Sequence, residues 1–177
     1  MQTFLPGGSN FLQTALDLDR QRLIKQGVES YQILRANAGL TKGWVNHPAT
    51  KMWRGHEGWL YLYTVRIYDE IKARGYKADA IDKIAELMNE YYPNWQDDVP
   101  PPWLYDDRVK ITHQGRLYEK APDKYPQFAQ SAKIYRKFVC CERCNYFWPT
   151  HTVDYVLEPI PVEDDLVQNL IEPKSEF

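Results

Sequence analysis

The sequence contains few cysteines and no long apolar run. The three cysteines among its 177 residues lie at positions 140, 141 and 144, whereas a secreted disulfide framework spreads an even number of cysteines along the chain. No run of about 18 apolar residues is present, so no membrane-spanning helix is expected. The first residues include neither a basic segment nor a long apolar segment, so no signal peptide is expected. These absences predict a cytoplasmic protein with reduced thiols and no membrane partner.

The chain also has little net charge, but its charges are unevenly distributed. The formal net charge is −2. Residues 154–177 contain seven acidic residues and one lysine, whereas residues 108–143 contain nine lysines and arginines and three acidic residues. A basic patch of this kind can bind nucleic acid. The acidic end is either a solvated tail, an intramolecular mimic of DNA or the contact for a protein partner.

What is present favours a mainly α fold. The 44% apolar and 14% aromatic content excludes wholesale disorder. Helical spacing of apolar residues and capping residues predict one short and four longer helices. Their expected ranges are 10–16, 19–35 (capped by Asp17 or Asp19), 48–74, 79–91 and 106–119.

The C-terminal part has a different pattern. Short apolar runs at 138–140, 146–148 and 153–156 are typical of strands. We therefore predict a compact bundle of about four helices with a small C-terminal β appendage.

The segment Leu18–Glu29 separates two faces when it is drawn as a helix. Around Arg22, the polar side chains Lys25, Gln26 and Glu29 fall within about 60°. The other side carries an apolar set that we interpret as the core stripe: Leu23, Ile24, Val28, Tyr31 and Leu34. The polar face is a catalytic or phosphate-binding wall if it lines a cleft, and an ordinary solvated face if it does not.

Several short motifs, in this order and spacing, resemble the pyrimidine-dimer DNA glycosylase family, which includes the phage endonuclease V-like enzymes. They are Asp19–Glu29, Asn46-His47-Pro48, Met52-Trp53-Arg54-Gly55, Arg74-Gly75-Tyr76 and His113–Lys120. The opening Met-Gln-Thr-Phe-Leu-Pro is similar to a bacterial branch of that family. The resemblance covers residues 1–128, which we expect to form a glycosylase-like helical domain. Residues 129–157 then form the cysteine-containing β appendage, and residues 158–177 the acidic tail.

The resemblance implies a DNA-repair glycosylase with abasic-site lyase activity. In the family, an N-terminal α-amine attacks the sugar C1′ and forms an imine, a glutamate that matches Glu29 assists, and elimination cuts the strand on the 3′ side. The bulk of Gln2 disfavours removal of Met1, so the nucleophile is the amine of Met1 or that of Lys25. An α-amine has a pKa near 8 and is more often neutral than a lysine near 10.4. Without the resemblance, Lys25 and Glu29 read as a surface pair worth about 0.3–0.5 kcal/mol.

The expected substrate is double-stranded DNA with a damaged or modified base. The match to the family implies that Arg116 and Lys120 contact the DNA backbone or the lesion. From the residues alone, like charges one helical turn apart either bind an anion between them or form a solvated basic face. The other candidate contacts with DNA are Arg22, Gln26, His47, Arg54, His113 and Gln114. His47, directly before Pro48, is equally suited to capping a helix.

No cofactor is expected, because an amine and a carboxylate suffice for this chemistry. Cys141 and Cys144 have the spacing of a zinc knuckle and His151 follows, but a structural zinc site needs four ligands. Cys140 is the remaining thiol, and its adjacency to Cys141 makes joint ligation awkward.

Two other functions remain open from the sequence. One is a DNA-binding module on the same fold without catalysis. The other is a protein-interaction factor that acts through the acidic tail.

Overall fold

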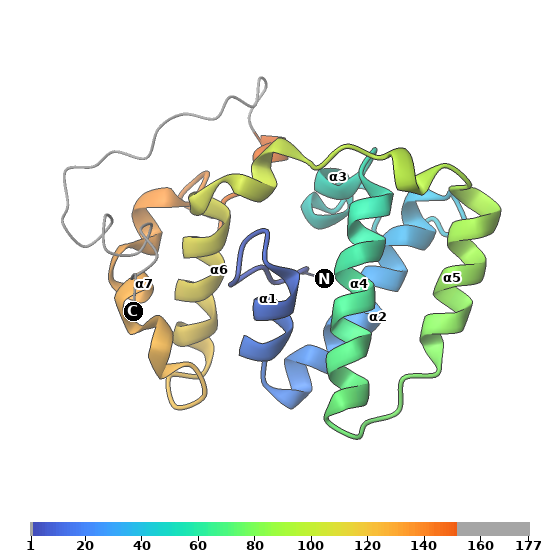
Figure 1. Ribbon diagram of the computed structural model, residues 1–177. Coiled ribbons are helices and arrows are strands. Elements are labelled where there is room, and N and C mark those ends of the chain that lie inside the picture. The colour runs from blue at the N-terminus through green and yellow to red at the C-terminus, as the bar shows by residue number, and fades with distance from the viewer. Residues whose placement is uncertain (1, 152–177) are drawn as a thin grey trace.

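The computed structural model describes residues 2–151, which form helices joined by loops (Figure 1). The α-helices are α1 (Phe11–Asp17), α2 (Arg20–Asn37), α3 (Pro48–Trp53), α4 (Glu57–Ala73), α5 (Ala80–Tyr91), α6 (Asp107–Lys120) and α7 (Ala129–Ile134). Short 3-10 helices lie among the connections. None of these helices is long and apolar enough to cross a membrane.

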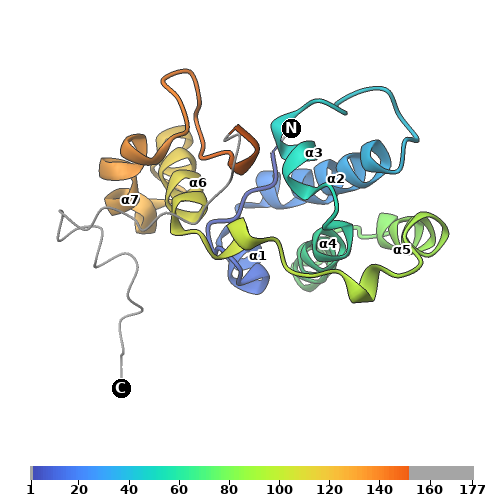
Figure 2. The same cartoon turned by 90° about the horizontal axis from the view of Figure 1, so that it is seen from above.

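The helices form two groups with the N-terminal segment between them. Helices α2, α4 and α5 lie on one side and α6 and α7 on the other, and α1 lies between the groups in both views (Figures 1 and 2). Helix α2 packs on α4, and α6 packs on α7. Phe4 and Leu5, just before α1, are buried in the main core. The first residues are therefore an internal part of the fold.

Capping residues set the start of α2 and α6, and the sequence predicts the first of them, Asp19. The Asp19 carboxylate accepts hydrogen bonds from the backbone N–H groups of Gln21 (2.9 Å) and Arg22 (3.1 Å) at the start of α2. Asp106 accepts one from Arg108 N–H (2.9 Å) at the start of α6. These bonds satisfy N–H groups that a helix leaves unpaired at its N-terminus.

The prediction of one continuous helix over residues 48–74 is wrong. The segment is divided into α3 and α4 at Arg54–His56. Gly55 has a φ of 80°, a left-handed conformation that glycine adopts without steric cost. The Glu57 carboxylate accepts a hydrogen bond from Gly55 N–H (3.1 Å) and fixes this break.

The predicted β appendage is also wrong for the described residues. Residues 129–151 contain α7 and 3-10 helices at Tyr135–Phe138 and Pro149–His151, and no strand. The aromatic run 146–148 is buried in the main core, and Phe147 N–H donates to the Thr112 hydroxyl on α6 (3.1 Å). A short apolar run gives no periodic signal that separates a strand from another buried segment. The expected strand 153–156 and the acidic tail lie outside the described residues.

Candidate active site

A cavity of about 380 Å³ opens between α2, α6 and the N-terminal segment. Its polar wall combines the charged face of α2 with the last turn of α6. The lining residues are Gln2, Phe4, Gln21, Arg22, Lys25, Gln26, Glu29, Arg116, Lys120, Asn145 and Tyr146. The polar face predicted from helical spacing on α2 therefore lines a cavity.

His113 holds the N-terminal segment against α6. Its side chain is wholly buried, Nδ1 accepts a hydrogen bond from Leu5 N–H (2.9 Å), and Nε2 lies 2.6 Å from the Gln2 side-chain amide. Burial, with a smaller contribution from the charge of Lys120, lowers the pKa of His113 to about 3. A neutral histidine thus fixes the chain next to Met1.

Gln26 joins the N-terminal segment to Glu29. Its Oε1 accepts hydrogen bonds from Phe4 N–H and from the Tyr63 hydroxyl, both at 2.8 Å. Its Nε2 donates to Glu29 Oε2 (3.1 Å). Because Gln26 is fully buried and its oxygen is held by two hydrogen bonds, its amide N–H orients the carboxylate.

Glu29 is a buried carboxylate beside an exposed amine. The Glu29 side chain is 8% exposed and the Lys25 side chain 67% exposed, and Lys25 Nζ lies 3.7 Å from Glu29 Oε1. A pair of this kind gains little from Coulomb attraction, because the amine is in water. The arrangement places a buried carboxylate in the cavity wall, next to a lysine side chain that extends into solvent.

Arg22 is fixed from behind by Asp19 and Tyr125. Its guanidinium donates to the Asp19 carboxylate and lies 5.1 Å from the centre of the Tyr125 ring. The Tyr125 hydroxyl donates to Asp19 Oδ2 (2.5 Å). Burial alone would raise the pKa of Asp19, but the hydrogen bonds from Tyr125 and Arg22 outweigh it and lower that pKa. Asp19 is therefore ionised and keeps Arg22 in the cavity wall.

Helix α6 adds two more cations. Arg116 forms an ion pair with Glu119 (2.7 Å), and Lys120 Nζ lies 3.4 Å from the Tyr146 hydroxyl. Burial and then the charges of Arg116, Arg22 and Lys25 lower the pKa of Lys120. Mutually repelling cations around a cavity are suited to an anionic substrate.

Three other predicted DNA contacts are buried side chains. His113 and Gln26 are fully buried, and Gln114 is nearly so, with its amide bonded to Pro6 O (2.7 Å) and the Ser131 hydroxyl (2.6 Å). These three side chains form hydrogen bonds within the fold around the cavity.

His47 and Arg54 lie at the two ends of α3. His47 accepts a hydrogen bond from Ala49 N–H (3.1 Å) as its N-cap, which is the structural alternative foreseen for it. Arg54 is exposed and donates to Val45 O (3.1 Å). Neither residue lines the cavity described above.

Several lining residues escaped the sequence analysis. Gln2 and Phe4 carry no chemical signal of their own, and Asn145 and Tyr146 fell in a predicted β segment. The Tyr146 ring packs edge-on against Phe4 and His113, with centroids 6.2 and 5.1 Å apart. Only the fold brings this loop to α2.

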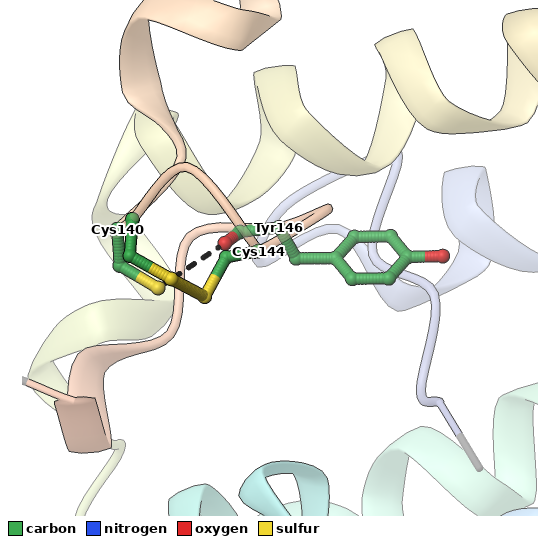
Figure 3. Close-up of a disulfide and its surroundings, with 4 residues drawn as sticks. Cys140, Cys144 and Tyr146 are labelled. Carbon is green, nitrogen blue, oxygen red and sulfur yellow. Dashed lines mark hydrogen bonds between the residues drawn. A yellow bond between two sulfur atoms is a disulfide. The ribbon is translucent and has the colours of Figure 1, made fainter.

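The cysteines differ from the expectation of reduced thiols. Cys141 and Cys144 form a disulfide, and the Cys140 sulfur lies beside it (Figure 3). The side chain of His151, the other predicted zinc ligand, lies outside what the structure describes.

The site places amines and a carboxylate around a cavity that is lined by several cations. Residues 1–84 match the model of the family named pyrimidine dimer DNA glycosylase, which confirms the family resemblance over that segment. The match includes Gln2 and the polar face of α2 but ends before Arg116 and Lys120. Comparisons with curated proteins and with solved structures found no match.

Proposed function

We propose that this protein is a DNA-repair glycosylase with abasic-site lyase activity on duplex DNA. The observation that carries the proposal is the cavity that joins Arg22, Lys25 and Glu29 on α2 to Arg116 and Lys120 on α6. The family match over residues 1–84 supports the glycosylase class and names the pyrimidine dimer as the lesion to test.

The proposed nucleophile is the α-amine of Met1. Gln2, the residue to which Met1 is bonded in the sequence, lines the cavity. A free α-amine has a pKa near 8, which leaves a useful neutral fraction at neutral pH. Lys25 is the second amine, but its side chain is 67% exposed and is free to swing into solvent.

Glu29 is the proposed acid–base group. As the amine attacks C1′, the damaged base leaves with its bonding electrons. The bond between C1′ and the ring oxygen then breaks, the nitrogen lone pair forms the iminium, and the ring oxygen takes up a proton; Glu29 supplies that proton or stabilises the iminium by its charge. Loss of a proton from C2′ then drives cleavage of the bond to the 3′ phosphate oxygen. Gln26 is a positioning residue, because its amide orients the Glu29 carboxylate.

Arg22, Arg116 and Lys120 are the proposed phosphate contacts. The charges of Arg116 and Arg22 lower the pKa of Lys120 in the absence of an anion. A phosphate between these cations would relieve that repulsion and release counterions from the DNA.

Borohydride trapping on a duplex with one abasic site tests this proposal. We expect a covalent protein–DNA adduct whose peptide map assigns the linkage to Met1, and no adduct on the same duplex without the abasic site. A duplex with one pyrimidine dimer should be cut after loss of the base. Salt-sensitive binding without any adduct or cutting would contradict the proposal and favour a non-catalytic DNA-binding module.

A further inference from the structure

The cysteine cluster is the strongest group of potential metal ligands outside the cavity. The ligand sulfur atoms of Cys140, Cys141 and Cys144 all lie within 4.8 Å of one another. The sulfurs around one tetrahedral zinc ion, with bonds of about 2.3 Å, are about 3.8 Å apart. In the sequence, the adjacency of Cys140 and Cys141 argues against joint ligation of one metal ion. In the fold, however, their sulfurs lie close enough together to bind the same ion.

The cluster is connected directly to the cavity wall. The backbone N–H and the sulfur of Cys140 both lie 3.5 Å from the Tyr146 carbonyl oxygen. The Tyr146 ring points away from the cysteines (Figure 3) and lines the cavity together with Asn145. A group bound by the sulfurs would therefore fix the loop that completes this wall.

We propose that the reduced cluster is a zinc site in which Cys140, Cys141 and Cys144 supply three thiolate ligands. Zinc prefers thiolates in a tetrahedral arrangement. Cys141 is exposed, so water can reach the cluster and take the fourth position. The bound ion clamps the loop that carries Asn145 and Tyr146.

The disulfide and the metal are alternative states of the same sulfurs. A dithiol reductant supplies two electrons and two protons to the Cys141–Cys144 disulfide, which becomes two thiols while the reductant becomes a disulfide. Zinc binding then releases the thiol protons, because the thiolate is the ligand. The proposal needs no DNA and stands independently of the proposed glycosylase activity.

Cobalt titration of the reduced protein tests the site, followed by displacement with zinc. We expect the reduced protein to bind one equivalent of cobalt and to show a thiolate-to-cobalt charge-transfer band. One equivalent of zinc should abolish this band, and the oxidised protein should show none. Cys140→Ser should weaken zinc binding at least tenfold and reduce the band. Glu142→Gln, in the same loop, should leave both unchanged.

Circular dichroism of each variant separates loss of folding from loss of a ligand. If Cys140→Ser does not fold, the wild-type protein provides a second test. The thiols that bound zinc protects from alkylation are counted, and three protected thiols support the proposal. A reduced, folded protein that binds no metal overturns it, as does full affinity in folded Cys140→Ser or protection of only two thiols.

Hydrogen exchange tests the clamp. Zinc should slow amide exchange in residues 140–146 of the reduced protein and leave α5 unchanged. Equal exchange with and without bound zinc would overturn the clamping of Asn145 and Tyr146.

Discussion

The two ends of the polar face of α2 each carry a carboxylate, and the two carboxylates have different surroundings. Asp19 caps the helix, forms an ion pair with Arg22 and accepts a hydrogen bond from the Tyr125 hydroxyl. It does not line the main cavity. Glu29 does line it, oriented by the neutral amide of Gln26. The comparison shows that Asp19 is used to build the wall, whereas Glu29 faces the space in which a substrate would bind.

Replacing Glu29 should produce the largest effect. Glu29→Gln keeps the size of the side chain but removes its charge and its acid–base capacity, which is typically worth about 10²–10⁴-fold in rate. We expect single-turnover cutting of abasic DNA to fall by about that factor. Glu86→Gln, exposed on α5, is the matched control. Cutting by Glu29→Gln at the wild-type rate would remove Glu29 from the mechanism.

Replacing Gln26 should reduce both stability and activity. Gln26→Leu leaves Phe4 N–H without its acceptor and removes one of the two acceptors of the Tyr63 hydroxyl, the other being Phe4 O (3.1 Å). A buried unsatisfied group costs about 1–3 kcal/mol. We expect the free energy of unfolding in urea to fall by about 2–4 kcal/mol. Gln32→Leu, on the exposed side of α2, should change it little. An equal loss in the two variants would contradict the positioning role.

Replacing Asp19 should weaken the fold more than the chemistry. Asp19→Ala removes the N-cap of α2, which typically costs about 1–2 kcal/mol. Thermal or urea unfolding measures this loss, and single-turnover cutting should stay within about tenfold of the wild type, because Glu29 is still in place. If Asp19→Ala loses as much activity as Glu29→Gln, the distinction between the two carboxylates fails.

Acid should destabilise the protein through His113. Its pKa is lowered to about 3 in the fold, against about 6.5 in the unfolded chain. Between these two pH values the unfolded chain binds a proton that the folded protein does not. The free energy of unfolding therefore falls as pH falls from about 6.5 towards 3, by at most about 1.4 kcal/mol per pH unit. His113→Gln should flatten the urea-unfolding profile between about pH 6.5 and 5. An unchanged slope would contradict a neutral His113.

Replacing Lys120 should give the smallest effect, and one confined to binding. Lys120→Gln removes one proposed phosphate contact, so DNA affinity should fall modestly and the slope of log K against log salt should decrease by about 1. Lys83→Gln, exposed on α5, is the control. An unchanged salt slope would place Lys120 outside the DNA interface.

The polar half of the site could be predicted from the sequence because it lies within one helix. Helical spacing puts Arg22, Lys25 and Glu29 on one face whatever the rest of the chain does. The same spacing gave the wrong environment for Ile24 and Val28, which are 38% and 49% exposed. Helix α4 covers a narrower face of α2 than the apolar pattern predicts. The spacing of residues along α2 does not specify how much of its surface a neighbouring helix covers.

The opposite wall could not be predicted in this way. Arg116 and Lys120 were identified through the resemblance, but their distance from Glu29 depends on how α6 packs against the N-terminal segment. Tyr146 was missed altogether, because a three-residue aromatic run has no periodicity. The buried network around His113 was missed too, because burial is a property of the packed fold.

The sequence by itself determined helix α2, its capping residue Asp19 and its polar face, because these depend on contacts between residues close together along the chain. The tertiary structure alone decided that this face encloses a cavity with α6, that Gln2 lies in its wall and that the three sulfurs meet beside Tyr146. The hydrogen-bonded pair of Gln2 and His113 joins positions 111 residues apart, and the cavity brings together α2, α6 and the loop that carries Tyr146. Their approach depends on the burial of shared apolar surface, which local spacing does not specify.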